Sequence, residues 1–291
     1  MASIAYISDG KMIEFHRLYG HDEINFWRLS TRQFSDFKEN DFLFFLVKSP
    51  HKEKGIAGFG KLKKIENLSL NQMWNRYGVL NGYESKEDLR LAIDSANKQD
   101  VFPGKLNCLY LQQVVYFESH LFLSEFGFEL HQNLESFTYI DSKFDVTSQL
   151  LVAASSIGLD LWTMSTTSHT GFNFDLEIMI HQLSYHVNVG ATHLEKRLAK
   201  KFNRDDKLLF IPQHEAILYD QKSIYFPLVS SKRKDLLRVF GLIVYCQKKV
   251  IAINSQQHIV YTDKKITDEM VEMFDLIEVR LVSVDELEVS E

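Results

Sequence analysis

The stretch DFLFFLVKSPHKEKGIAGFGKLKKIENL, residues 41–68, reads as two β-strands with a turn between them. Residues 42–47 are an unbroken apolar run of strand length, which is typical of a buried strand. Residues 54–68 alternate apolar residues with small or basic ones, the pattern of a second strand. Gly58 and Gly60 leave one face of that strand almost bare, which indicates the close approach of another backbone or of a ligand.

Short helices and further strands are expected after this stretch. Ser69 is placed to cap a short helix, and Ser85 with Asp88 three residues later has the spacing of a capping box that opens a second one. Residues 105–118 and 135–140 have the composition of strands. A strand-rich core with short helices in its connections predicts a small, curved sheet or barrel, within an α+β protein.

The rest of the chain alternates between helical and strand-like patterns. Residues 175–187 and 191–202 have helical spacing, whereas residues 207–231 and 237–262 resemble β-hairpins or a meander. Residues 267–281 form an amphipathic pattern whose first residue, a threonine, is suited to cap a helix. We therefore expect a second, mixed α/β domain in this half.

The composition is that of a globular protein large enough for two domains. The chain has 291 residues, of which 45% are hydrophobic, 25% charged and 13% aromatic. The pattern changes near residue 142, where a linker or linking helix is expected. The predicted division is a first domain over residues 1–145 and a second over residues 155–291.

Several classes of protein are disfavoured by simple features. No apolar run is long enough to span a membrane, and the first residues lack the basic and apolar regions of a signal peptide. Cys108 and Cys246 lie in apolar segments and without a nearby partner cysteine, so they indicate buried thiols in a reducing cytoplasm. No nucleotide-binding glycine motif or serine-hydrolase motif is present.

The net charge of −6 is unevenly distributed. Residues 48–64 contain six lysines and one glutamate, and residues 196–249 contain thirteen Lys and Arg against five Asp and Glu. Residues 261–291 reverse the balance, with ten acids against three bases. Concentrated basic surface attracts phosphate, although each cluster also fits an ordinary solvated surface.

The first half resembles a known family through several motifs in order. INFWRLSTRQF (24–34) is followed by the strand at 42–47, the glycine-rich GIAGFG (55–60), a W…YG…NG…S segment and the strand at 105–118. Together they resemble the N-terminal PUA-like, EVE-type domain of HNH-type modification-dependent restriction endonucleases. The resemblance covers about half of the chain, and nothing in residues 150–291 aligns with an HNH nuclease.

This resemblance implies binding of DNA that carries a modified base, with modified cytosine as the expected base, within a bacterial defence system that restricts foreign DNA. The base would be lifted out of the duplex into an aromatic pocket, where stacking offsets the cost of unstacking. The ring faces would come from Trp27, Phe59, Trp74 and Tyr77, and the contacts to the base edge from Asn25, Ser30 and Asn81. The phosphate contacts would come from Arg28, Lys48, Lys61, Lys63 and Lys64. Trp27 and Trp74 also fit a simple core role.

Two features of the second half suggest chemistry. Asp206, Asp220 and Lys222 have the spacing of a metal-dependent nuclease, in which two carboxylates hold Mg²⁺ and a lysine helps to activate water. Asp220 and Gln221 also fit an ordinary hairpin turn. The run SSKRKDLLR (230–238), with Lys232, Arg233 and Lys234, is expected to be a charged loop that could follow a DNA backbone.

Three functions are therefore open from the sequence. The first is a reader of modified DNA whose second domain adds DNA contacts, self-association into a homodimer or cleavage. The second is an RNA-binding or adaptor protein, because fold alone does not fix function. The third is a Mg²⁺-dependent nuclease that uses Asp206, Asp220 and Lys222.

Overall fold

The strands predicted in the deciding stretch form the centre of the first sheet. In the computed structural model they are β3 (Phe42–Lys48) and β4 (Lys54–Leu68), and the strand expected over residues 105–118 is β5 (Leu106–Leu121). The structure describes residues 2–30, 33–48, 53–97, 101–157, 173–187 and 189–284. These residues divide into two compact units, Ala2–Phe174 and a second that begins at Asp175.

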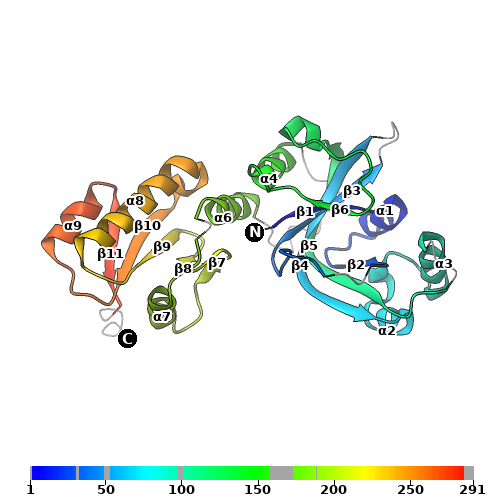
Figure 1. Ribbon diagram of the computed structural model, residues 1–291, viewed down its shortest axis with the longest axis horizontal. Helices are drawn as coiled ribbons and strands as arrows, with labels where there is room; N and C mark the ends of the chain where they lie inside the picture. Colours follow the sequence, from blue (N-terminus) through cyan, green and yellow to red (C-terminus); the bar gives the residue numbers. More distant parts are fainter. Residues whose placement is uncertain are drawn as a thin grey trace. The chain divides into compact units, whose positions relative to one another are not determined.

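The N-terminal unit contains a six-stranded sheet in the order β2-β5-β4-β3-β1-β6 (Figure 1). Its remaining strands are β1 (Ile4–Ile7), β2 (Ile24–Arg28) and β6 (Phe137–Tyr139). β1 runs parallel to β3, and the other pairs are antiparallel. Strands β4 and β5 pair along most of their length through several register shifts, which bend the sheet.

The bare face of β4 accommodates a neighbouring strand. A Cβ atom added at Gly58 would lie 2.2 Å from the carbonyl oxygen of Val115 on β5, far inside van der Waals contact. At Gly60 an added Cβ would lie 3.0 Å from the Leu111 Cβ atom, also on β5. The close approach predicted from these glycines is therefore confirmed, and the approaching group is protein backbone and side chain.

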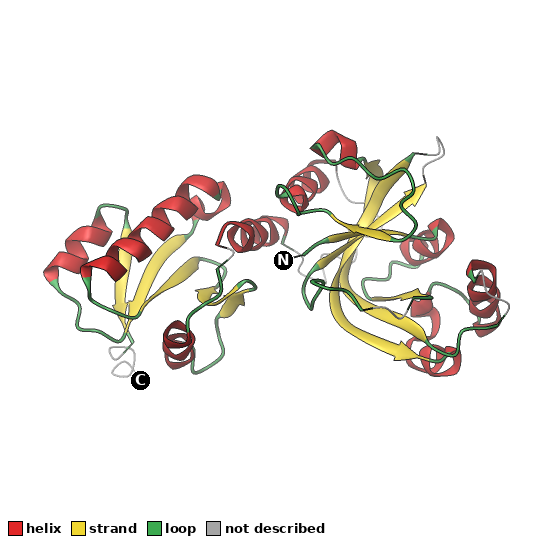
Figure 2. Cartoon of the chain, viewed as in Figure 1, coloured by secondary structure: helices red, strands yellow, loops and turns green. Residues whose placement is uncertain are grey.

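The helices of this unit lie in its connections (Figure 2). Two begin at the predicted serine caps: α2 (Leu70–Tyr77), which Ser69 caps with Gln72, and α3 (Lys86–Ala96), which Ser85 caps. A short 3₁₀ helix, η1 (Gly78–Asn81), follows α2. The sequence reasoning did not identify α1 (Gly10–Leu18) or the 3₁₀ helix η2 (Leu123–Phe126).

The boundary between the units falls later than the predicted division between residues 145 and 155. The helix expected as a linker is α4 (Val146–Ile157), and its side chains Val146, Leu150 and Leu151 are completely buried. α4 belongs to the N-terminal unit and packs on β5 and η2. A helix buried to this degree is part of a domain core and does not act as a spacer.

The C-terminal unit contains a five-stranded sheet in the order β11-β10-β9-β8-β7. β7, β8 and β9 are antiparallel, and β9, β10 and β11 are parallel. The strands are β7 (Leu209–Ile211), β8 (His214–Tyr219), β9 (Ser223–Leu228), β10 (Gln257–Thr262) and β11 (Val279–Ser283). The helices are α6 (Phe174–Val187), α7 (His193–Phe202), α8 (Arg233–Lys249), the 3₁₀ helix η3 (Ile251–Ser255) and α9 (Asp268–Asp275).

The two faces of this sheet are covered by different helices. Ile217, Ile224 and Phe226 share a hydrophobic cluster with residues of α8 and α9. Ala216 and Leu218, which flank Ile217 on β8 and so point to the opposite face, share a cluster with Leu198 and Ala199 of α7 and with Tyr261 of β10. The face of β10 and β11 that carries Tyr261, opposite to α8 and α9, therefore lies beside the end of α7. We call it the outer face of these strands.

Two secondary-structure predictions in this unit were wrong. The segment after residue 232, predicted as a charged loop and a strand, forms α8, in which Leu236, Val239, Ile243 and Cys246 are buried at helical spacing. The helix expected over residues 267–281 ends at Asp275, and the chain then enters β11. The sequence of α8 suggests a strand because it contains many β-branched and aromatic residues, which are common in strands.

The predicted α+β fold class is confirmed by these two mixed sheets and their helices. Both cysteines are buried and unbridged, and burial raises the pKa of Cys108 to about 11 and that of Cys246 to about 12. None of the helices in the described part of the chain is both long and apolar enough to cross a membrane.

Candidate functional sites in the two units

Two of the three polar side chains expected to read a base, Asn25 and Asn81, are bonded to each other inside the N-terminal unit. The Asn25 amide nitrogen donates to the Asn81 side-chain oxygen at 2.7 Å, and both residues are completely buried. Asn81 in turn donates to the Gly78 carbonyl oxygen at 2.7 Å. The Trp27 indole N–H donates to the Asn81 carbonyl oxygen at 3.2 Å. These bonds attach η1 to the edge strand β2.

The four predicted ring faces have different surroundings. Phe59 is completely buried, and its ring packs edge-on against Phe42 and Phe44 with centroids 5.4 and 5.7 Å apart. The prediction that Phe59 stacks on a base is therefore wrong. Trp27 and Trp74 are half-buried and pack against the cluster beneath α2 and α3, so neither indole is fully enclosed. Neither tryptophan is among the residues that line four of the cavities in the described part of the chain.

Two predicted phosphate contacts lie inside the unit. Arg28 is only 6% exposed, donates from Nε to the Asn107 side-chain oxygen at 2.7 Å and covers the Phe34 ring at 4.0 Å. Lys61 is 8% exposed, and its Nζ lies 5.6 Å from the centre of the Phe42 ring. Buried cations with aromatic and amide neighbours stabilise the fold and are not positioned to bind phosphate on the surface.

A surface of β4, β5 and α2, which we call the tyrosine–lysine face, carries the exposed cations Lys63, Lys64 and Arg76. Beneath them the Tyr77 and Tyr110 rings stack with centroids 5.2 Å apart at 26°. Lys63 and Lys64 place Nζ 5.6 and 5.7 Å from the centre of the Tyr110 ring. Their side chains are 46% and 45% exposed, so they remain accessible to a ligand.

Two carboxylates partly balance the charge of the tyrosine–lysine face. Glu66 accepts from Tyr77 Oη at 2.6 Å and pairs with Arg76 and Lys64, and these hydrogen bonds lower the pKa of Glu66 to about 2. Glu23 accepts from Tyr110 Oη at 2.5 Å and lies 3.7 Å from Lys63 Nζ. Burial and the Glu23 hydrogen bond raise the pKa of Tyr110 to about 12. The face carries three cations and two carboxylates.

Two other predicted site residues of this unit, Lys48 and Ser30, are not on the elements that form the tyrosine–lysine face. Lys48 is exposed at the end of β3 and lines a cavity of about 250 Å³ that Arg17, Glu118 and His120 also line. Ser30 is exposed just after β2. Sequence reasoning missed Tyr110 and Arg76. Tyr110 lies opposite Lys64 where β5 pairs with β4, and this register joins two strands that helices separate in the sequence.

In the C-terminal unit, Asp220 organises a turn. Its Oδ1 accepts from the backbone N–H groups of Lys222 and Ser223 at 2.7 and 2.8 Å, and its Oδ2 accepts from Tyr225 Oη at 2.9 Å. The hairpin-turn interpretation of Asp220 is thus correct. Lys222 is exposed in the same turn, and Asp206 is exposed in the loop after α7 with a left-handed backbone, φ 51°. Their proposed metal chemistry stays a prediction.

The basic run of residues 232–234 lies at the start of α8 and not in a loop. Lys232 is the N-cap residue, and all three side chains are exposed. Arg233 lies 3.7 Å from Glu269 of α9. A helix N-terminus already carries partial positive charge, so adding three cations there strengthens the local attraction for anions.

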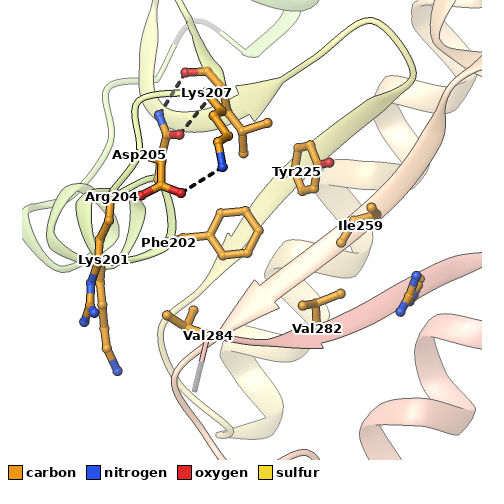
Figure 3. Close-up of a pocket in the computed structure, with 12 residues that line it drawn as sticks. Lys201, Phe202, Arg204, Asp205, Lys207, Tyr225, Ile259, Val282 and Val284 are labelled. Carbon is orange, nitrogen blue, oxygen red and sulfur yellow. Dashed lines mark hydrogen bonds and ion pairs between the residues drawn. The ribbon is translucent and has the colours of Figure 1, made fainter. Parts of the chain in front are cut away.

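A cavity of about 600 Å³ lies between the end of α7 and the outer face of β10 and β11 (Figure 3). Its floor is formed by aromatic and aliphatic side chains, and its rim by Lys201, Arg204, Lys207 and Arg280 together with one carboxylate, Asp205. The sequence reasoning counted these cations but did not place them around one cavity. The sequence feature that could have indicated this cluster of cations is the run KKFNRDDK (200–207), which begins at the end of the helical pattern of residues 191–202.

Comparison with known proteins gives a structural likeness for one half of the chain. The structure of ASCH from Zymomonas mobilis, a PUA-like domain, is 16% identical, covers 52% of this chain and 94% of its own, and has a TM-score of 0.36. Two single-residue mutant proteins of the same ASCH have TM-scores of 0.36 and 0.38, with 16% and 15% identity. Each match covers 52% of this chain, and it covers 96% of the first mutant protein and 95% of the second. No protein-family model and no curated protein matches the sequence.

Proposed function

We propose that the protein binds nucleic acid through the tyrosine–lysine face of its N-terminal unit. The observation that carries this proposal is the position of Lys63 and Lys64 over the ring of Tyr110, at the surface. Stacked rings hold the two ammonium groups near each other, and phosphates are bound by such neighbouring cations. The PUA-like resemblance of the sequence motifs supports the same function.

The carboxylates of the face are compatible with this role. Ion pairs between exposed side chains contribute less than about 1 kcal/mol, so a phosphate backbone with several charges can replace Glu23 as the partner of Lys63. Glu66 is held by Tyr77 and Arg76 and stays in place. Its contribution is to orient Lys64, whose Nζ lies 3.1 Å from the Glu66 carboxylate.

A direct test is duplex binding by the Lys63→Gln/Lys64→Gln double variant, measured by fluorescence anisotropy over a range of salt concentrations. Each lost phosphate contact lowers the salt slope by about 0.9, so the double variant should lose about 1.8. The matched control is Lys11→Gln/Lys86→Gln, which removes the same charge from exposed positions on α1 and α3. An equal loss of salt slope in both variants would show that only net charge matters, and it would refute binding through the tyrosine–lysine face.

The narrower proposal is that the N-terminal unit binds DNA with a modified base, modified cytosine above all, turned out of the duplex. Because the Trp27 N–H is bonded to Asn81, Trp27 can contact a base only through its ring. Trp74 is the second half-buried indole of the same cluster. With Asn25 and Asn81 bonded to each other, contacts to the base edge would have to come from other groups or from a rearranged Asn25–Asn81 pair.

This narrower proposal is tested with duplexes that differ only in the modification, compared at one salt concentration, and with RNA of the same sequence. A modified-base reader prefers the modified duplex, and Trp27→Leu should remove that preference while leaving binding to plain DNA. Equal affinity for both duplexes rejects base reading but not nucleic-acid binding. A preference for RNA over every duplex would instead support an RNA-binding protein.

A further inference from the structure

The cavity beside α7 combines an apolar floor with a basic rim. Phe202, Tyr225, Ile259 and Val282 form the floor, and Figure 3 shows the Phe202 ring near its centre, with Lys201 and Arg204 extending from the end of α7. Four cations and one carboxylate on the rim give it a net positive charge. Its volume of about 600 Å³ is within the usual range for small-ligand sites.

The floor is held rigidly by contacts outside the cavity. The Phe202 ring stacks on the fully buried Tyr261 ring, with centroids 4.4 Å apart at 16°. Tyr225 is held by its hydroxyl group, which donates to Asp220 at 2.9 Å. Asp220, predicted from the sequence as a metal ligand, thus orients a ring of the cavity. Rings with fixed positions lose little conformational freedom when a flat ligand stacks on them.

The rim is also preorganised. The Asn203 side chain closes the loop after α7, because its Nδ2 donates to the Leu208 carbonyl oxygen at 2.8 Å and its Oδ1 accepts from the Leu208 N–H at 2.9 Å. The same loop carries Arg204 and Lys207. The ion pair between Lys207 and Asp205, at 3.0 Å, joins two exposed side chains and is easily exchanged for an anionic ligand.

We infer that the C-terminal unit binds a nucleotide in this cavity, with the base on the apolar floor and the phosphate on the basic rim. A nucleotide is the common ligand that joins a flat π-system to an anionic group, and it matches both parts of the cavity. It can come from a nucleic-acid strand or from a free nucleoside phosphate. Where it belongs to a strand, the inference rests on the proposed function.

The test uses the full chain and a ten-residue thymidine oligonucleotide with one photoreactive 5-iodouracil. Irradiation should crosslink the iodouracil to Phe202 or Tyr225, and mass spectrometry identifies the residue. UMP, added as competitor, distinguishes the two sources: competition shows that a free nucleotide suffices, and its absence shows that a strand is bound. In both cases the crosslink lies in the cavity and supports the inference.

Two variants separate the floor from the rim. Val282 is half-exposed in the floor of the cavity, so a larger side chain at this position occupies the space for the base. Val282→Trp should therefore weaken oligonucleotide binding at least about tenfold. Arg204→Gln/Lys207→Gln should lower the salt slope by about 1.4, or about 0.7 for each lost phosphate of a single strand. The matched control is Lys248→Gln/Lys249→Gln at the end of α8, and circular dichroism confirms that each variant folds.

The inference is overturned if the crosslinks map outside the cavity, or if folded Val282→Trp binds the oligonucleotide as the unchanged protein does. Its failure is distinguishable from that of the proposed function. Lys63→Gln/Lys64→Gln tests duplex binding by the N-terminal unit and should leave the crosslink to Phe202 or Tyr225 intact. Loss of duplex binding without any crosslink in the cavity would leave only the proposed function standing.

Discussion

The buried pair Asn25 and Asn81 gives a prediction that can be worked out from the structure. In Asn81→Ala, the Asn25 amide loses its 2.7 Å acceptor and the Gly78 carbonyl loses its 2.7 Å donor. Two lost hydrogen bonds cost about 2 kcal/mol, and an Asn25 amide left buried without a partner adds about 1 kcal/mol. We expect the free energy of unfolding of the N-terminal unit to fall by about 3 kcal/mol.

The assay is urea unfolding followed by tryptophan fluorescence, to which Trp27 and Trp74 of this unit contribute. A loss of about 3 kcal/mol also lowers the melting temperature by about 6–12 °C in a unit of this size. The backbone carbonyl of residue 81 still accepts from the Trp27 indole in the variant, so the fluorescence signal of the folded state should persist.

The double-mutant cycle decides whether the pair acts as a unit. Asn25→Ala alone leaves the Asn81 side-chain oxygen without its donor, so each single variant includes the cost of an unpaired partner. Asn25→Ala/Asn81→Ala removes both partners, and its loss should be at least about 1 kcal/mol smaller than the sum of the single losses. Additive losses, within about 0.5 kcal/mol, would refute the structural role that we assign to the pair.

Three further predictions concern other parts of the chain. Gly58→Ala should severely reduce the yield of folded protein or its melting temperature, because its Cβ would meet the Val115 carbonyl oxygen at 2.2 Å; unchanged thermal unfolding would contradict this. Burial lowers the pKa of His16 to about 3, below its unfolded value near 6.5, so the unfolded chain binds the extra proton and stability falls as pH drops from 6.5 toward 3. His16→Gln should flatten that fall by up to about 1.4 kcal/mol per pH unit, measured by urea unfolding at pH 6.5 and 4.5, and parallel curves would argue against it. Phe59→Ala should cost about 3–5 kcal/mol by calorimetry as a core truncation, and a cost below about 1 kcal/mol would mean that the ring is not in the core.

The candidate site shows where sequence reasoning stopped. In β2 the alternation that buries Ile24 and Phe26 also directs Arg28 inward, so a residue type typical of phosphate binding became a core cation. From the sequence, Arg28 and Lys63 look equally suited to phosphate. Only the packing around Arg28 separates them, because its Nε donates to Asn107, which is distant in the chain, and its guanidinium covers the Phe34 ring.

Local chemistry in the sequence determined the strands at 42–48 and 54–68, the serine caps at 69 and 85, and the Asp220 turn. These features depend on a few neighbouring residues, because alternation, capping and turn geometry act over less than about ten positions. The tertiary structure alone decided that α8 is a helix, that Phe59 is a core residue and that four cations surround one cavity. Each of these depends on packing between segments distant in the chain, and packing free energy outweighs the weak local preferences that a sequence displays.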